Sequence, residues 1–270
     1  MTNMPEHTAD TVDYSGVSGV INIYKEKGYT SHDVVAVVRG LLNRAKTGHT
    51  GTLDPDAEGV LPVCVGRATK LADRIAASDK SYTCALVLGA VTDTYDTSGA
   101  LTARRPDGFA DIDAAFMRTV SETVSGFMGP QEQTPPMYSA IKVGGRKLYE
   151  LARKGISVER APRQIDVLDI KITSAGARDI AVGGETCRNF PVIGLEVTCS
   201  KGTYIRSLCF DIGERLELGG CMADLVRTRS GAFDVKDSVR LSELKALVAE
   251  GRLSERLIPP ERLTAYFRIQ

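Results

Sequence analysis

The sequence has no net charge, few histidines and no long apolar run, and each of these features excludes a class of protein. Lysine plus arginine and aspartate plus glutamate both number 34, so any nucleic acid or membrane partner must be met by a local patch. No hydrophobic run is long enough to span a membrane, and the N-terminus lacks the basic-then-apolar order of a signal peptide. Three histidines and six cysteines without a CxxC pair argue against a zinc site and a disulfide framework. We therefore expect a protein of the reducing cytoplasm that uses no metal and no membrane.

The patterns that are present predict an α+β fold with a mixed, largely antiparallel sheet flanked by helices. A chain of 270 residues with 43% hydrophobic and 25% charged residues can bury the core of one large domain or two smaller ones. Strand and helix patterns mix without a regular βαβ alternation, which argues against a parallel sheet. We expect strands at 19–26, 59–66, 80–92, 163–175, 190–200 and 221–233, and helices at 31–42 (with Ser31 as N-cap), 68–78, 111–124, 201–216 (with a Gly-led entry) and 240–251.

Residues 128–157 interrupt these patterns and carry a local charge. The stretch holds three prolines and a Gly-Gly pair and ends in an amphipathic helical turn. Between residues 142 and 163 there are seven basic and two acidic residues. Such a run is often only a solvated face, but the interleaved Tyr138 and Tyr149 favour contact with RNA or phosphate. The candidate contact patch consists of Lys142, Arg146, Lys147, Arg153 and Lys154.

One carboxylate stands in an unusual setting, within "GHTGTLDPDAEGVL" at residues 48–61. Gly48 and Gly51 permit backbone conformations that other residues resist, and Pro55 makes its predecessor Asp54 extended. Asp-Pro is also ordinary turn chemistry, and nothing local decides between a turn and a functional loop.

Several kinds of site can be compared for this loop. There is no Walker pattern GxxxxGK[ST] and no GxSxG with a partnering histidine. A metal site through Asp56 and Glu58 lacks the rest of a ligand loop. What remains is a nucleophilic or basic carboxylate held by an arginine.

Five motifs together carry a resemblance to a known family. The stretches are "GHTGTLDPDAEGVLPVCVGRATK", "SDKSY", "TPPMYSAIKVGGRKLYELARKG", "CSKGTYIRSL" and "DLVRTRSGAF". In this order, over roughly residues 19–235, they resemble the bacterial tRNA pseudouridine synthase B family. The resemblance implies a pseudouridine synthase core over 19–240 with a thumb-like insertion at about 128–157. A flexible tail at 1–18 would precede the core. A short C-terminal segment at 241–270 would follow, with the full RNA-binding PUA module of many members apparently absent.

The resemblance also implies an activity. The family isomerises uridine 55 in the T arm of tRNA to pseudouridine, by base flipping and without cofactor or metal. Its catalytic aspartate corresponds to Asp54, and the arginine that stabilises the carboxylate corresponds to Arg206. Whether the carboxylate adds to the base, adds to the sugar or assists elimination to a glycal stays open.

Further residues acquire roles through the same motifs. Tyr82 corresponds to the catalytic tyrosine that stacks on the uracil and is a candidate to take the proton from C5. Tyr204 and Leu225 correspond to residues that line the uridine pocket. His49 corresponds to the histidine that inserts into the RNA loop, where it offsets part of the energy of base flipping. Lys25 has a supporting role, although the family often has Lys-Pro where this chain has Lys25-Glu26.

The expected partner is therefore the T-arm stem-loop of tRNA, bound by a monomer. Two other functions stay open at this point. One is a tRNA-binding chaperone without catalysis, which the intact Asp54, Tyr82 and Arg206 argue against. The other is an archaeal-type relative guided by a separate RNA, which would be expected to carry the C-terminal RNA-binding module.

Overall fold

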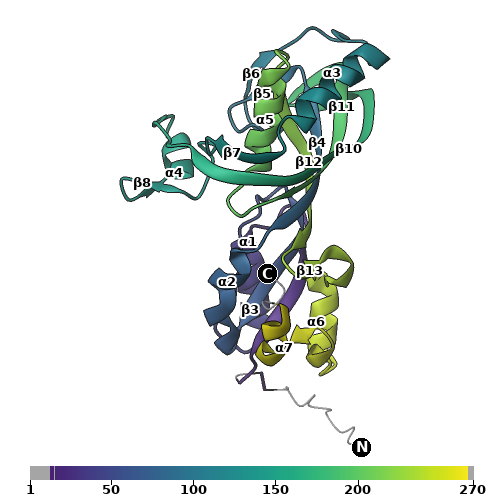
Figure 1. Ribbon diagram of the computed structural model, residues 1–270. Coiled ribbons are helices and arrows are strands. Elements are labelled where there is room, and N and C mark those ends of the chain that lie inside the picture. Colours follow the sequence, from purple (N-terminus) through teal and green to yellow (C-terminus); the bar gives the residue numbers. More distant parts are fainter. Residues whose placement is uncertain (1–12, 15, 267–270) are drawn as a thin grey trace, which may run out of the picture. The chain divides into compact units, whose positions relative to one another are not determined.

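The computed structural model describes residues 13–14 and 16–266, which form two compact units. The first unit combines the described residues up to Ala76 with those from Ala232 onward, and the second contains residues 77–231. Figure 1 shows both units, coloured along the sequence. Most of the predicted N-terminal tail, namely residues 1–12 and 15, lies outside the described residues. Within the described residues the paired strands of either unit run antiparallel, with isolated parallel bridges between Ile23 and Val239 and between Asp96 and Met222, and the predicted α+β fold is confirmed.

In the first unit the central strand is β3, which pairs with β1 on one side and with the short β2 on the other. Strand β14 extends the sheet beyond β1, so the predicted C-terminal tail contributes a strand that the sequence patterns missed. The strands are β1 (Gly19–Lys25), β2 (Thr47–His49), β3 (Glu58–Val65), β13 (Phe233–Asp234) and β14 (Leu257–Ile258).

Helices pack on both faces of this sheet because its strands alternate between two apolar sets. Ile21, Ile23, Leu61 and Val63 pack with residues of helices α1 and α6, whereas Val20, Val60 and Cys64 pack with residues of η1, α2 and α7. Each fully buried Val, Leu or Ile contributes about 1.5–3 kcal/mol to the stability of this unit. The helices are α1 (Ser31–Leu41), η1 (Gly66–Leu71), α2 (Ala72–Ala76), η2 (Val235–Asp237), α6 (Leu241–Ala249), η3 (Leu253–Glu255) and α7 (Pro260–Tyr266).

Helix α1 begins at Ser31, so its N-cap lies one residue earlier than predicted. The N-cap is Thr30, whose hydroxyl accepts from the Asp33 amide, while the Asp33 carboxylate accepts from the Thr30 amide. The prediction of Ser31 as N-cap is wrong because a reciprocal capping box satisfies two helix-end amides at once. This leaves the Ser31 hydroxyl available for Leu53, in the loop that carries Asp54.

In the second unit the strand order is β12-β4-β11-β10-β7. The predicted strand over 80–92 is broken at Gly89, which has a φ of +93° and leaves no room for a Cβ beside the Phe109 ring. The strands are β4 (Lys80–Leu88), β5 (Ala90–Thr92), β6 (Leu101–Arg104), β7 (Gly129–Gln133), β8 (Lys142–Val143), β9 (Arg146–Lys147), β10 (Arg163–Val182), β11 (Glu185–Cys199) and β12 (Gly220–Ser230).

Three helices accompany this sheet: α3 (Ala114–Ser125), α4 (Leu148–Ala152) and α5 (Ile205–Arg215). Helix α5 packs against β12 and β4, and its first five residues, Ile205 to Cys209, are all buried. Helix α4 and the β8–β9 hairpin stand out from the rest of the unit (Figure 1). All six cysteines of the chain are free and buried, as expected of small hydrophobic residues.

Candidate active site

The loop that carries Asp54 is held by a buried lysine from the neighbouring strand. Lys25 ends β1, has no exposed surface, and donates to the carbonyl oxygens of Glu26 at 3.2 Å, Pro55 at 3.1 Å and Ala57 at 2.6 Å. Such charge-assisted hydrogen bonds are stronger than neutral ones. Lys25 therefore fixes the backbone immediately after Asp54. Its predicted supporting role would be to hold this loop in place.

The other side of the loop is fixed by α1 and by tight turns. The Ser31 hydroxyl accepts from the Leu53 amide at 2.9 Å and lies 3.2 Å from the Leu53 carbonyl oxygen. The Ala57 amide donates to the Asp54 carbonyl at 3.1 Å, and Gly51 adopts a φ of +149°. With its backbone tied on both sides, the half-exposed Asp54 side chain is presented from a fixed position.

His49 lies at the end of β2, close to the Asp54 loop in sequence. Its ring packs edge-on against His32 with centroids 5.2 Å apart, and its Nδ1 accepts from the Gly51 amide at 3.3 Å. The imidazole is half-buried. These contacts orient the ring that the sequence predicts to enter the RNA loop.

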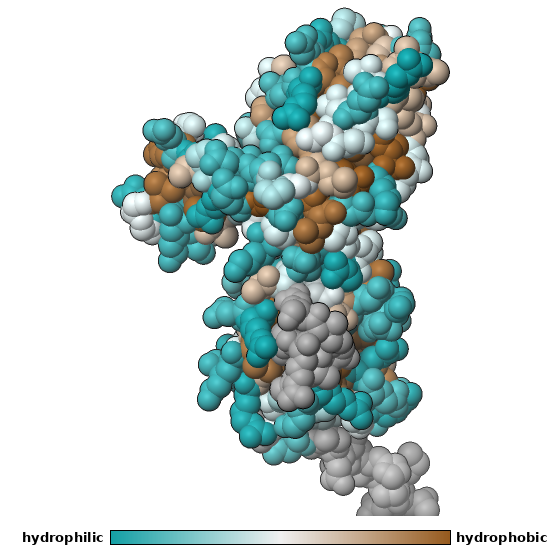
Figure 2. All heavy atoms as spheres, in the orientation of Figure 1, coloured by the Kyte–Doolittle hydropathy of each residue, from teal (hydrophilic) through white to brown (hydrophobic). Residues whose placement is uncertain are grey.

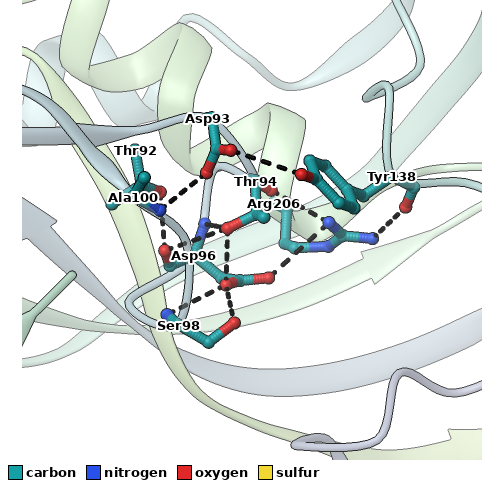
Figure 3. Close-up of polar contacts among 8 residues, drawn as sticks. All are labelled: Thr92, Asp93, Thr94, Asp96, Ser98, Ala100, Tyr138 and Arg206. Atoms are coloured by element: carbon teal, nitrogen blue, oxygen red, sulfur yellow. Dashed lines mark hydrogen bonds and ion pairs between the residues drawn. The ribbon is translucent and has the colours of Figure 1, made fainter. Parts of the chain in front are cut away.

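The second unit contains Arg206, the second residue of α5, with a side chain only 5% exposed. Its Nη1 donates to the Thr94 carbonyl at 2.9 Å and lies 3.6 Å from Asp96 Oδ2, while Nη2 donates to the Tyr138 carbonyl at 2.8 Å (Figure 3). A guanidinium presents several donors in a fixed fork, which suits it to this set of acceptors. Arg206 thus connects α5 with two loops.

Asp96 is itself held in place by its own loop. Its Oδ1 accepts from the Ser98 amide at 3.0 Å, the Ser98 hydroxyl at 2.6 Å and the Thr94 hydroxyl at 2.7 Å (Figure 3). These loop residues have no role predicted from the sequence. A local signal is the pair of aspartates in "DTYDTSG", but only the fold brings Asp96 to Arg206.

Tyr82 lies in the middle of β4 and is 9% exposed. In the sheet it is opposite Val197 on β11 and Arg227 on β12. Two residues before it, burial lowers the pKa of Lys80 to about 8, with a further contribution from Arg227. Arg227 is also buried, so Tyr82 shares its part of the sheet with two buried cations. No local sequence pattern indicates a role for either cation.

The remaining predicted pocket residues lie on the same unit. Leu225 is 8% exposed and falls where the β12 register shifts between Ala223 and Val226. Tyr204 is the N-cap residue of α5. Its amide donates to Gln133 Oε1 at 2.8 Å and its carbonyl accepts from Gln133 Nε2 at 3.1 Å. This pair of bonds fixes the start of the helix that carries Arg206.

The predicted RNA-contact patch lies on the projecting β8–β9 hairpin and just after the C-terminal end of α4. Figure 2 shows hydrophilic residues beside hydrophobic ones on this segment. The Tyr149 ring lies close to two cations of the patch, with its centroid 5.4 Å from Lys147 Nζ and 5.3 Å from Arg153 Cζ. Four of the five patch residues are exposed and Lys147 is half-buried: Lys142, Arg146, Lys147, Arg153 and Lys154.

The residues of the predicted site are thus divided between the two units. His49 and Asp54 belong to the first unit, and Tyr82, Tyr204, Arg206 and Leu225 to the second. Among the residues that the structure describes, no group of three or more His, Cys, Asp or Glu side chains is arranged to hold a metal ion. No helix in the same described part is long and apolar enough to cross a membrane.

Comparison with known protein families identifies the chain. Residues 39–205 match the model of the TruB family pseudouridylate synthase N-terminal domain. The chain belongs to the TruB family. Residues 206–264 match the tRNA pseudouridylate synthase B C-terminal domain. The family predicted from five sequence motifs is therefore confirmed, and with it a pseudouridine synthase, an isomerase.

Individual TruB relatives agree along most of the chain. It is 47% identical over 246 residues to tRNA pseudouridine synthase B of Symbiobacterium thermophilum, a match covering 91% of this chain and 75% of that protein. It is 44% identical over 246 residues to the protein of the same name from Bacillus subtilis, covering 91% and 76%.

Solved structures show the same fold at lower identity. One is described as a Cbf5-Nop10-Gar1 complex, with 27% identity, a TM-score of 0.65, and coverage of 94% of this chain and 63% of that chain. Another is an H/ACA RNP bound to a substrate RNA containing 2'-deoxyuridine, with 26% identity, a TM-score of 0.63, and coverage of 92% and 61%. The chain thus spans less than two thirds of these solved chains.

Proposed function

We propose that this protein converts uridine 55 in the T arm of tRNA to pseudouridine, with Asp54 as the catalytic carboxylate. In this isomerisation the bond between uracil N1 and ribose C1′ breaks and a bond between C5 and C1′ forms. The proton lost from C5 is balanced by the one gained at N1, so the reaction needs no oxidant, cofactor or energy source. Support comes from membership of the TruB family and from a loop that presents one carboxylate from a fixed backbone.

The observation that carries the proposal is the setting of Arg206. A buried guanidinium, held by fixed carbonyls and by Asp96, is a preorganised positive charge of the kind that stabilises an ionised carboxylate. We assign Arg206 as the counter-charge of Asp54 from the family motifs. Tyr82 stacks on the flipped uracil, and Tyr204 and Leu225 line its pocket. His49 fills the space that the flipped nucleotide leaves in the RNA.

The segments take corresponding roles in this proposal. Residues 19–240 form the catalytic region, with 128–157 as a thumb that folds against the T arm, and 241–270 form a C-terminal segment. The protein acts as a monomer in the cytoplasm, without a metal. Its affinity for the T arm comes in part from the exposed cations Lys142, Arg146, Arg153 and Lys154, together with Lys147.

The deciding experiment maps pseudouridine at each uridine of an unmodified tRNA transcript. Wild-type protein and Asp54→Asn are incubated separately with the transcript, and tRNA binding is measured alongside. We expect modification of the T-arm uridine by the wild type only, with binding by both. Tight binding without product from either protein would instead favour an RNA chaperone. Loss of binding in Asp54→Asn would make Asp54 a structural residue.

Salt dependence tests the assigned patch. Each lysine or arginine that contacts a phosphate releases counterions, so the logarithm of the affinity should fall as the logarithm of the salt concentration rises. Replacing Lys142 and Arg146 with glutamine should reduce that slope by about one to two. An affinity for T-arm RNA that is the same at low and moderate salt would refute the patch assignment.

A further inference from the structure

Arg206 bonds to two loops, and these two loops are also bonded directly to each other. One loop supplies the Thr94 carbonyl and the other supplies the Tyr138 carbonyl, at 2.9 Å and 2.8 Å from the guanidinium nitrogens. The Tyr138 hydroxyl in turn donates to Asp93 Oδ2 at 3.4 Å. Because Asp93 directly precedes Thr94, these bonds form a closed ring through Arg206, which Figure 3 shows from Asp93 across Tyr138 to the guanidinium.

Asp93 is held in place in this ring by two hydrogen bonds to Ala100. Its Oδ1 accepts from the Ala100 amide at 2.8 Å, and its own amide donates to the Ala100 carbonyl at 3.0 Å. Burial and the neighbouring Asp93 raise the pKa of Tyr138 above its ordinary value of 10.0. The phenol is therefore protonated at neutral pH and donates the hydrogen bond.

Tyr138 lies at the base of the projecting segment that carries the basic patch. On one side the Ser207 hydroxyl of α5 donates to the Thr134 carbonyl at 3.1 Å. On the other side the Tyr149 amide of α4 donates to the Ser139 carbonyl at 3.1 Å. The base of the segment is thus bonded both to the helix of Arg206 and to the helix of the patch. A shift of this base displaces the Tyr138 carbonyl from Arg206.

We propose that Tyr138 and Asp93 are positioning residues for Arg206: their side-chain bond keeps the Tyr138 carbonyl where it aligns the guanidinium. The inference rests on the proposed function, in which Arg206 stabilises the catalytic carboxylate. Neither residue needs to touch the uridine. Their contribution is to the rate of the chemical step, through the orientation of a group that must be preorganised.

The test uses Tyr138→Phe, Asp93→Asn and the double variant in the full chain. Tyr138→Phe removes only the hydroxyl. Asp93→Asn keeps the Oδ1 acceptor for Ala100 but places an amide donor opposite the phenol. Tyr14→Phe is the matched control, because it removes a tyrosine hydrogen bond to a backbone carbonyl, that of Val248, in the first unit. Three quantities are measured for each protein: the single-turnover rate with saturating enzyme, the Kd for tRNA and the Tm.

Tyr138→Phe should lower the single-turnover rate about tenfold and Asp93→Asn about threefold or more, in keeping with the loss of one hydrogen bond. The Kd should stay within about twofold of wild type, and the Tm should change no more than in Tyr14→Phe. The double variant should be no slower than Tyr138→Phe alone, because both substitutions break the same bond.

Three results would overturn the inference while leaving the proposed function intact. The first is a wild-type rate in Tyr138→Phe. The second is an effect on Kd alone, which would make Tyr138 an RNA contact. The third is a double variant whose loss is the product of the two single losses, which would mean that the residues act independently. A wild-type protein that forms no pseudouridine would overturn both proposals.

Discussion

The two units hold their key charged side chains in different ways. In the first unit, Lys25 fixes the loop and a different residue, Asp54, is presented by it. In the second unit, Arg206 is the presented charge and also the donor that joins the Thr94 and Tyr138 loops. Stability and activity can therefore be separated by mutation in the first unit, whereas in the second they reside in one side chain.

The largest effect on activity without loss of stability is expected from Asp54→Asn. The contacts that fix this loop involve backbone atoms of Leu53, Pro55 and Ala57, which the substitution leaves in place. Pseudouridine formation should fall by at least about a thousandfold because the amide is not a nucleophile or base. The free energy of unfolding should change by less than about 1 kcal/mol. Urea denaturation and single-turnover assays on the same preparations measure both, and a large drop in stability would contradict the comparison.

Arg206→Met should affect both quantities together. Two carbonyls lose their donor and the carboxylate of Asp96 loses its counter-charge, which lowers the free energy of unfolding by about 3 kcal/mol. Activity should fall at least about a hundredfold. Arg206→Lys is the control that keeps the charge but not the planar fork, and it should recover part of the stability and little activity. A variant that is inactive but as stable as wild type would show that Arg206 does not hold the loops.

This difference also marks what the sequence could predict. Motifs of contiguous residues indicated Asp54 and Arg206, and hydrophobic periodicity predicted most helices and strands. The bonds of Arg206 join residues 112 and 68 positions away, and no local pattern encodes such pairs. The ring through Asp93 and Tyr138 was missed for the same reason.

Three smaller differences between the predicted and the observed helices and strands have physical causes. Ser31 and Thr30 are both good caps, and the acid three residues after Thr30 decides between them. The break at Gly89 depends on the ring of Phe109, which no strand pattern contains. Strand β14 has only two residues and exists because β1 offers its edge, so periodicity could not reveal it.

Lys25→Met tests whether the residue that holds the Asp54 loop is needed for stability and activity in the first unit. Three carbonyls lose a charged donor, so the free energy of unfolding should fall by about 2 kcal/mol. Activity should fall about tenfold, because a loosened loop misplaces Asp54 without removing it. Ser31→Ala, which releases the loop at Leu53, should show the same pattern at about half the loss of stability. Equal activity in all three proteins would mean that the loop holds Asp54 without either support.

Lys80→Met gives the smallest expected effect and completes the comparison with a buried lysine from the second unit. Burial, then Arg227, lowers the pKa of Lys80 from 10.5 to about 8, so the folded state binds its proton less tightly than the unfolded state does. Between these two pKa values the unfolded chain binds more protons, and the contribution of Lys80 to stability therefore rises with pH. The wild type should gain about 1 kcal/mol relative to Lys80→Met between about pH 7 and about pH 9. Denaturation of both proteins across this range measures the difference. A constant or falling difference would mean that Lys80, like Lys25, is held as a stabilised cation.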